Sequence, residues 1–362
     1  MKILYLSNGV GLALAVRLAQ EGHETKVFIH NDYSDTGQNV FERISAWKPY
    51  VNRSDLVIAD DPLFGYKELR FENAPTRTLG ISRFLSIANR SASSRRKLLD
   101  LTGFDVVDTG PSTYSVEAWW NGRKWCTPFI LVKYYKNLIS DAVGPSLGAM
   151  VTICQTLEDI PTALFEGFKN LKPLFEKGYY RGPIRLDFVD TSVYDFYAGF
   201  TYDNTEAILE GVQESPLDIL LEVAGGVRSD LNLIPGNYCA IRLQHIGWPT
   251  TRDYRIYGLV DANIKHCGLS NVLLKHGHYY CSQTFGPILK VTARGDQVKD
   301  SFNRASRTLA NIEVEDICYR ADLVQQFSKT KYNDFDNILN KWKATKATNQ
   351  KSAGGKTKST QE

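Results

Sequence analysis

The sequence has no disulfide framework and no pair of closely spaced cysteines. Its six cysteines, at positions 126, 154, 239, 267, 281 and 318, are scattered over 362 residues without a Cys-x-x-Cys pair. A secreted domain held by disulfides would show close and regular spacings, so this scatter indicates reduced thiols in a reducing compartment.

Long apolar runs and a secretory leader are lacking as well. No stretch approaches the roughly 18 apolar residues that a membrane helix needs. The first residues, MKILYLSNG, have neither a basic n-region nor a cleavage site. We therefore expect a cytoplasmic protein with no membrane partner.

The excess of positive charge is small, because 43 Lys and Arg face 40 Asp and Glu, which gives a formal net charge of +3. Part of the excess lies in residues 341–362, which hold six lysines and one glutamate. This composition predicts a partly disordered, Lys-rich tail over 328–362. The tail is either a solubilising end or a basic arm that is a candidate for contact with DNA.

The remaining chain has the composition of a folded protein, and its length predicts two or three subdomains. Residues 2–29 have the pattern of a strand, a glycine turn, a helix and a second strand, which predicts a parallel sheet. The full G-x-G-x-x-G pattern would need a third glycine at Leu14. A phosphate site and a turn without a ligand both remain open. The candidate substrate-binding residues of this turn are Asn8, Gly9 and Gly11.

A second group of candidates follows the buried strand SDLVIADDPL (54–63). In an open parallel sheet, ligands bind at the carboxyl ends of the strands. We therefore predict that Asp61 and Pro62 contribute to a substrate site, with a solvated acidic turn as the alternative.

The segment GPIRLDFVDTSVYDFYAGF (182–200) alternates apolar and charged residues. The alternation predicts a strand that points Arg185 and Asp187 away from its apolar face. Asp187 and Asp195 are spaced for the two arms of a hairpin, where facing carboxylates can bind Mg²⁺. Paired solvated acids beside Arg185 are the alternative.

The stretch DAVGPSLGAM (141–150) combines proline and glycine in the way of a shaped loop. Lys136 and Asp141 stand at its entrance and are candidate catalytic residues together with Arg185. Farther on, 235–327 has the pattern of short strands closed by a helix. The candidate substrate-binding residues of the loop are Gly144, Pro145, Ser146, Gly148 and Met150.

Two carboxy-terminal segments resemble one known family. The segment GPILKVTARGDQVKDSFNRASRTLANIEVEDICYRADL (286–323) resembles the Gly-Gly-Arg-Val-Leu-Gly-Val-Thr-Ala-x-Gly-Asp strand and helix of glycinamide ribonucleotide synthetase, the phosphoribosylamine–glycine ligase of purine biosynthesis. The segment CAIRLQHIGWPTTRDYR (239–255) resembles that family's Gly-Tyr-Pro and Asp-Tyr segment. The loop at 144–150 resembles its Asp-Thr-Gly-Pro-Asn-Thr-Gly-Gly-Met-Gly loop, where the amino acid and the phosphorylated amine meet.

The resemblance implies an α/β, ATP-grasp-like fold and adds Arg294 to the candidate substrate-binding residues. It also places Asp187 and Asp195 where ATP-grasp enzymes hold a metal, which makes Mg²⁺ a candidate cofactor. The expected parts are an N-terminal parallel α/β domain (1–103), a reduced central domain (104–234), a mostly β C-terminal domain (235–327) and the tail (328–362).

The chain departs from the family in three places. Gly11 and Leu12 replace an Arg-Glu-His turn, and Tyr197 replaces the Asn that follows the second metal acid. Between Gly103 and Ser115 the family inserts a subdomain with a Gly-Lys-Gly loop that closes over ATP, and only FDVVDTGPSTY (104–114) stands here. Phosphates need cations or backbone N–H groups, so we expect no ATP binding of the usual kind.

Three functions follow from these features. The first is an amino-acid transferase or C–N ligase that joins glycine to a phosphorylated or pyrophosphorylated nucleotide-type acceptor without ATP, for example a modified base in viral DNA. The second is an ATP-dependent phosphoribosylamine–glycine ligase, and the third is an inactive binding module.

Overall fold

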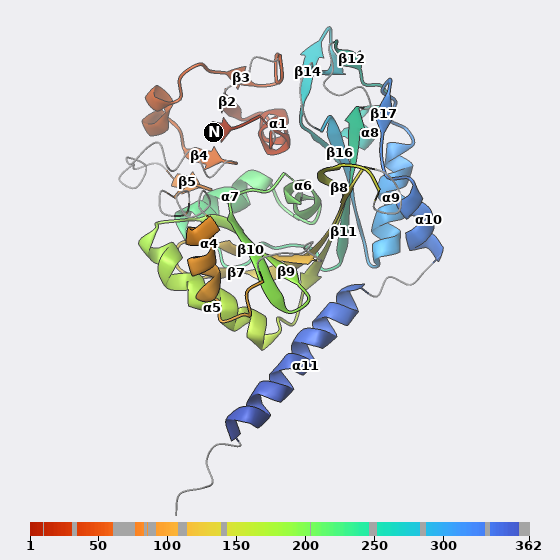
Figure 1. Ribbon diagram of the computed structural model, residues 1–362. Helices are drawn as coiled ribbons and strands as arrows, with labels where there is room; N and C mark the ends of the chain where they lie inside the picture. The colour runs from red at the N-terminus through yellow and green to blue at the C-terminus, as the bar shows by residue number, and fades with distance from the viewer. Residues whose placement is uncertain are drawn as a thin grey trace, which may run out of the picture.

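The protein is described here from a computed structural model (Figure 1). The structure describes residues 1–9, 11–30, 35–60, 77–82, 85, 92–107, 114–138, 143–202, 204–245, 252–282, 287–329 and 334–354. These residues form a parallel sheet, a large antiparallel sheet and a small third sheet, with helices packed around them. The α/β arrangement with an N-terminal parallel sheet is the one predicted from the sequence. Among these residues, no helix is both long and apolar enough to cross a membrane.

The N-terminal sheet has the strand order β3-β2-β1-β4-β5, and every neighbouring pair is parallel. Helix α1 provides the crossover between β1 and β2 and buries its apolar side against the sheet. The 3₁₀ helix η1 precedes β4. The elements are β1 (Lys2–Ser7), α1 (Ala13–Gln20), β2 (Glu24–Ile29), β3 (Glu42–Arg43), η1 (Lys48–Arg53), β4 (Leu56–Ala59) and β5 (Arg77–Leu79).

The nine-stranded sheet is antiparallel and runs in the order β10-β9-β6-β7-β8-β11-β16-β13, with β17 paired to β11. The predicted Asn-Gly turn joins β6 to β7, and the Asn121 side chain accepts the N–H groups of Arg123 and Lys124. The strands are β6 (Tyr114–Trp120), β7 (Trp125–Asn137), β8 (Ser146–Leu157), β9 (Gly182–Val189), β10 (Ser192–Ala198), β11 (Asn237–His245), β13 (Cys267–Leu269), β16 (Leu289–Gly295) and β17 (Ile317–Cys318).

The large sheet crosses the domain boundary expected at residue 235. Strand β11 pairs with β8 through Ile241 and Val151, so the central and C-terminal segments share one continuous sheet. The third sheet belongs to the C-terminal segment and has the order β12-β15-β14. Its strands are β12 (Tyr254–Arg255), β14 (Val272–Lys275) and β15 (His278–Cys281).

Helices cover the outer face of the large sheet, and α6 lies inside its curve, next to α1 (Figure 1). On the outer face, Phe168 and Phe175 of α5 pack edge-on against Trp125, and α9 packs on β11 and β16. The helices are α4 (Ala92–Asp100), α5 (Thr162–Lys177), α6 (Thr205–Leu209), α7 (Pro216–Gly225), α8 (Asp261–Ile264), α9 (Val298–Leu309), α10 (Asp322–Lys329) and α11 (Asp334–Gly354).

The two faces of the large sheet differ in chemistry, as the alternation in 182–200 predicted. Ile184, Leu186 and Phe188 are fully buried toward the outer helices. Arg185 and Asp187 point to the inner face, because successive side chains of a strand alternate. The inner face looks toward α6 and the parallel sheet, and this orientation places the charged residues beside the glycine turn.

The tail that was expected to be partly disordered contains a long helix, α11. Its first half is docked: Trp342 is 1% exposed and packs edge-on against Tyr114 and Phe188, with ring centroids 5.0 and 5.3 Å away. Lys133 also forms an ion pair with Asp334 at the start of the helix.

We predict that Trp342→Ala releases α11 from the outer face and lowers the free energy of unfolding by about 3 kcal/mol, the usual cost of truncating a buried Trp. Chemical denaturation measures the loss, and limited proteolysis should show faster cleavage within α11. Lys343→Ala, an exposed neighbour, is the matched control. Unchanged protection of α11 in Trp342→Ala would contradict the docking role.

Candidate functional site

A cavity of about 200 Å³ lies where the carboxyl ends of β1 and β4 meet the inner face of the large sheet. The sequence predicted Asn8, Gly11 and Arg185 as site residues, and the structure brings these three together. Strands β9 and β10 supply one wall, and the segment after β10 supplies another. The lining residues are Asn8, Gly11, Asp60, Arg185, Tyr197, Phe200, Thr201 and Tyr202.

A carboxylate lies against the glycine turn. Asp60, which directly follows β4, is buried, and its Oδ2 accepts the Ser7 hydroxyl at 2.5 Å. The same hydroxyl accepts the backbone N–H of Gly9 at 2.9 Å. A Cβ at Gly11 would lie 2.6 Å from Asp60 Oδ2, so only glycine allows this approach.

This arrangement decides which charge the turn favours. A glycine turn before a helix can bind an anion through its backbone N–H groups. Here the Asp60 carboxylate already lies against the turn, and a second anion beside it would be repelled. The turn therefore favours a cationic group such as an ammonium, and the phosphate alternative left open by the sequence is disfavoured.

Arg185 provides the positive charge of the cavity. Its guanidinium forms an ion pair with Asp187, with N–O distances of 2.9 and 3.1 Å. The ring centroids of Tyr134 and Tyr197 are each 5.5 Å from the guanidinium carbon, a distance typical of cation–π contact. These contacts hold the guanidinium in place at the cavity wall.

The predicted catalytic Lys136 lies near the same cluster. Its ammonium is 5.5 Å from the centroid of the Tyr134 ring. The Tyr134 hydroxyl in turn accepts a long hydrogen bond from Arg185, at 3.4 Å. Lys136 and Arg185 therefore both lie against the ring of Tyr134, and of these two cations only Arg185 belongs to the cavity lining.

The predicted metal acids face each other, but their surroundings do not suit a metal. Asp187 and Asp195 are directly opposite in the β9–β10 register, as the hairpin spacing predicted. Asp187 is held by Arg185 and by the Ser115 hydroxyl, and Asp195 lies 3.4 Å from Arg95. A guanidinium at the carboxylate occupies the place of a divalent cation. Within the described residues, no cluster of three or more His, Cys, Asp or Glu could hold a metal.

We predict that removing divalent metal with EDTA and then adding millimolar Mg²⁺ leaves the melting temperature of the protein unchanged. In Arg185→Met the guanidinium that pairs with Asp187 is gone, so Mg²⁺ gains access to that carboxylate and should raise the melting temperature. Arg53→Met, an exposed site, is the control. A Mg²⁺-induced rise in the natural protein that Asp195→Asn abolishes would contradict this prediction.

The glycine-proline loop enters β8 and is fixed at its base. The Asn137 side chain donates to the carbonyl of Gly144 at 3.0 Å, and Leu138 N–H donates to the carbonyl of Pro145 at 3.1 Å. Arg320 is buried, forms a bidentate ion pair with Asp322, and donates to the Asn137 carbonyl. The Tyr-Arg-x-Asp segment therefore holds the base of this loop.

The other predicted residues have different places. Gly148 reaches the cavity wall, because a Cβ there would lie 2.3 Å from the Tyr202 hydroxyl. Ser146 is exposed where β8 begins, and Met150 is fully buried within the strand. Arg294 lies on β16 and is not part of the cavity lining. Three predicted residues, Asp61, Pro62 and Asp141, lie outside the described residues.

Glu117 is a buried acid on β6, next to Arg185 in the β6–β9 register. It is 1% exposed and accepts hydrogen bonds from Trp119 at 2.8 Å and from Asn204 at 2.6 Å. Burial raises the pKa of Glu117 from 4.5 to about 7, while these hydrogen bonds and the charge of Arg185 oppose the rise. A carboxyl group with such a pKa can exchange a proton near neutral pH.

We predict that stability falls as the pH rises from about 4.5 to about 7, since the folded protein then keeps a proton that the unfolded chain loses. The difference between the two Glu117 pKa values corresponds to about 3 kcal/mol. Glu117→Gln should remove most of this pH dependence and stabilise the protein above about pH 7. Denaturation curves across this range test it, with exposed Glu158→Gln as the control. An unchanged slope in Glu117→Gln would contradict the assignment.

Sequence reasoning did not assign a role to several of these residues. Asp60 directly follows β4 and belongs to the acidic turn that the sequence placed at the carboxyl end of this strand, but only Asp61 and Pro62 of that turn were predicted as site residues. Glu117 interrupts the apolar run SVEAWW, and a lone acid in a buried strand is the signal that could have identified it. Tyr202 follows β10 in irregular sequence and gives no signal of its own.

The fold is that of ATP-grasp enzymes. No family model matches the chain, and no curated protein matches it in sequence. Solved structures match it in fold, with low sequence identity, and at that identity the likeness shows the fold alone. Among the matching structures are a ligase, a synthetase and a carboxylase.

The phosphoribosylamine–glycine ligase of Thermotoga maritima matches with a TM-score of 0.63 and 14% identity, over 88% of this chain and 99% of that one. The N5-carboxyaminoimidazole ribonucleotide synthetase of the same organism matches with a TM-score of 0.55 and 11% identity, over 87% and 99%. The pyruvate carboxylase of Rhizobium etli matches with a TM-score of 0.60 and 11% identity, and this chain spans 38% of its length.

Proposed function

We propose that this chain is a divergent relative of phosphoribosylamine–glycine ligase that joins glycine to a phosphorylated or pyrophosphorylated nucleotide-type acceptor without ATP. One observation carries the proposal: Asp60 and Arg185 line the same cavity of about 200 Å³. An amino acid brings an ammonium and a carboxylate, which these two side chains complement. Pockets for drug-sized ligands hold roughly 300–1,000 Å³, so this cavity suits a smaller molecule.

The reaction needs one bond to form and one to break. The amine nitrogen attacks the acceptor carbon that bears the phosphate or pyrophosphate. The carbon–oxygen bond breaks as the carbon–nitrogen bond forms, and the leaving group keeps the electron pair. The ammonium must first lose a proton, and Asp60 is the carboxylate placed to receive it. Lys136, beside Arg185, is placed to stabilise the leaving phosphate.

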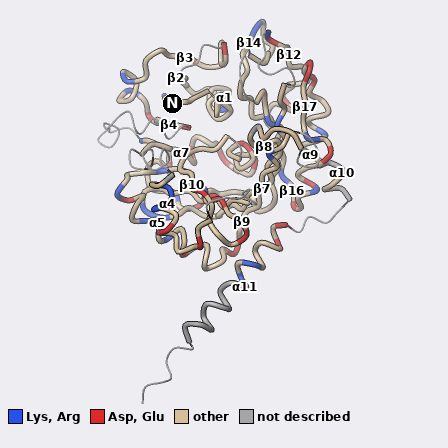
Figure 2. The backbone as a smooth tube through the Cα atoms, viewed as in Figure 1, with Lys and Arg blue, Asp and Glu red and all other residues tan. Residues whose placement is uncertain are grey.

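Independence from ATP is supported by the length of one connection. Only residues 104–113 separate Gly103 from the first residue of β6, too few for a subdomain that closes over ATP. An acceptor that arrives with its leaving group attached needs no such subdomain. A modified base in viral DNA is the acceptor we favour, and the Lys-rich sequence of α11 suits contact with its phosphates. Over the described residues, Lys and Arg are interspersed with Asp and Glu (Figure 2).

The first experiment supplies labelled glycine and either a pyrophosphorylated nucleoside or DNA containing one, without ATP. The proposal predicts a labelled product and one released pyrophosphate for each glycine joined. Product formation only with ATP and phosphoribosylamine would favour the ATP-dependent ligase instead. No product across phosphate and pyrophosphate acceptors would contradict the proposal and favour a binding module.

We further predict that Asp60→Asn and Arg185→Met each lower the rate of glycine transfer roughly 100-fold, the usual effect of removing one placed polar group from an active site. Arg53→Met is the control for loss of an arginine at an exposed position. Near-normal rates in both site variants, with the fold intact by circular dichroism, would place the reaction elsewhere.

A further inference from the structure

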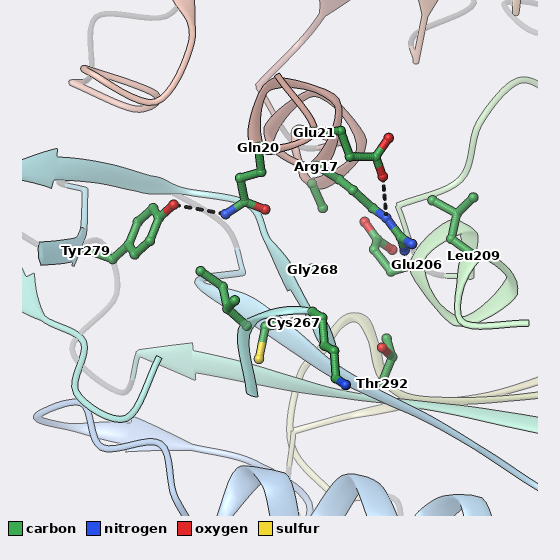
Figure 3. Close-up of a pocket in the computed structure, with 12 residues that line it drawn as sticks. Arg17, Gln20, Glu21, Glu206, Leu209, Cys267, Gly268, Tyr279 and Thr292 are labelled. Atoms are coloured by element: carbon green, nitrogen blue, oxygen red, sulfur yellow. Dashed lines mark hydrogen bonds and ion pairs between the residues drawn. The ribbon is translucent and has the colours of Figure 1, made fainter. Parts of the chain in front are cut away.

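A second cavity, of about 380 Å³, lies between helix α1 of the N-terminal part and strands of the C-terminal part (Figure 3). Helices α1 and α6 form one side, and α8, β13, β15 and β16 form the other. Gly11 lines the first cavity and Ala13, the first residue of α1, lines this one, so the two cavities lie near each other at the start of α1. The volume falls within the roughly 300–1,000 Å³ of small-molecule sites.

Small residues keep the cavity open. A Cβ at Gly268 would lie 2.6 Å from Cγ of Glu206 and 3.4 Å from Cβ of Ala13, so any larger residue would fill the space between α6 and β13. Cys267 beside it is an inert wall, because burial raises the pKa of its thiol to about 12 and its Sγ donates to the Asn263 carbonyl.

The charges that line the cavity leave one cation without a counterion. Arg17 is paired with Glu21 at 3.4 Å, and Glu206 is paired with Lys290 at 3.3 Å. Lys265 is exposed at the rim, and within the described part of the chain it has no hydrogen-bond or ion-pair partner. The cavity therefore presents one uncompensated positive charge next to an apolar wall.

The hydrogen-bonding side chains that line the cavity already have partners. The Gln20 amide donates to the Tyr279 hydroxyl at 2.9 Å and links α1 to β15 across the cavity (Figure 3). The Thr292 hydroxyl, on β16, already donates to Glu210 at 2.7 Å. A ligand therefore meets apolar surface and polar groups that already have partners. Lys265 is the lining residue whose charged group is left to bind an anion.

We propose that this second cavity binds a small organic anion, with its carboxylate or phosphate on Lys265 and its apolar body against Leu209, Ile264 and Cys267. The cavity joins α1 of the N-terminal part to α8 and β13 of the C-terminal part, so a bound anion holds these parts together. The proposal rests on this cavity alone and stands whether or not the chain transfers glycine.

Three probes with one ring separate charge from shape: benzoate, phenyl phosphate and the neutral benzamide. We expect saturable binding of at least one anion by titration calorimetry and at least tenfold weaker binding of benzamide. Lys265→Met should weaken anion binding roughly tenfold, which corresponds to about 1.4 kcal/mol. The tighter of the two anions tells whether the site prefers carboxylate or phosphate.

Two controls locate the binding. Lys299→Met removes an exposed lysine on α9 and should leave the affinity unchanged, and so should Arg185→Met in the first cavity. Absence of saturable binding by both anions would overturn the proposal, as would equal affinity of the Lys265→Met variant. If the affinity falls in Arg185→Met but not in Lys265→Met, the anion binds in the first cavity. That result would also overturn the proposal.

Discussion

The ion pair between Arg185 and Asp187 is the interaction on which the inner face of the large sheet depends. Two charges taken out of water cost several kcal/mol each, and only close geometry with further hydrogen bonds offsets that cost. Here the Ser115 hydroxyl donates to Asp187, and Tyr134 and Tyr197 lie against the guanidinium. The result is a fixed cation at the cavity wall, which also takes the position that a metal would need.

Apolar packing on the outer face of the large sheet offsets the free-energy cost of burying charged groups on its inner face. Trp120, Trp125, Phe168 and Phe175 form a cluster of ring contacts between the sheet and α5, with Phe168 and Phe175 edge-on against Trp125. Aromatic rings bury large areas and gain further energy from edge-to-face contact. Because successive side chains alternate along a strand, β6 and β9 present Trp120 and Phe188 outward and Glu117, Arg185 and Asp187 inward.

Much of the fold follows from local patterns in the sequence. Alternation in 182–200 predicted the two-faced strand, and the spacing of Asp187 and Asp195 predicted that they face each other on a hairpin. The glycine turn between two apolar strands predicted the parallel unit. Local sequence patterns do not predict which distant segments of the chain come into contact. Asp60 enters the turn formed by Gly9 and Gly11 only because β4 pairs with β1, and this pairing reverses the charge that the turn prefers.

Local patterns also did not predict the surroundings of Asp187 and Asp195. These surroundings bear on the chemistry that we propose. Spacing alone placed two carboxylates on facing strands, which suits Mg²⁺, but the guanidinium that neutralises Asp187 comes from the same strand two residues earlier. In the reaction that we propose, no charge on ATP has to be offset. Lys136 and Arg185 can instead offset the smaller charge that develops on one leaving phosphate group. In this proposal the energy for bond formation comes from the acceptor, whose leaving group is attached before it reaches the site.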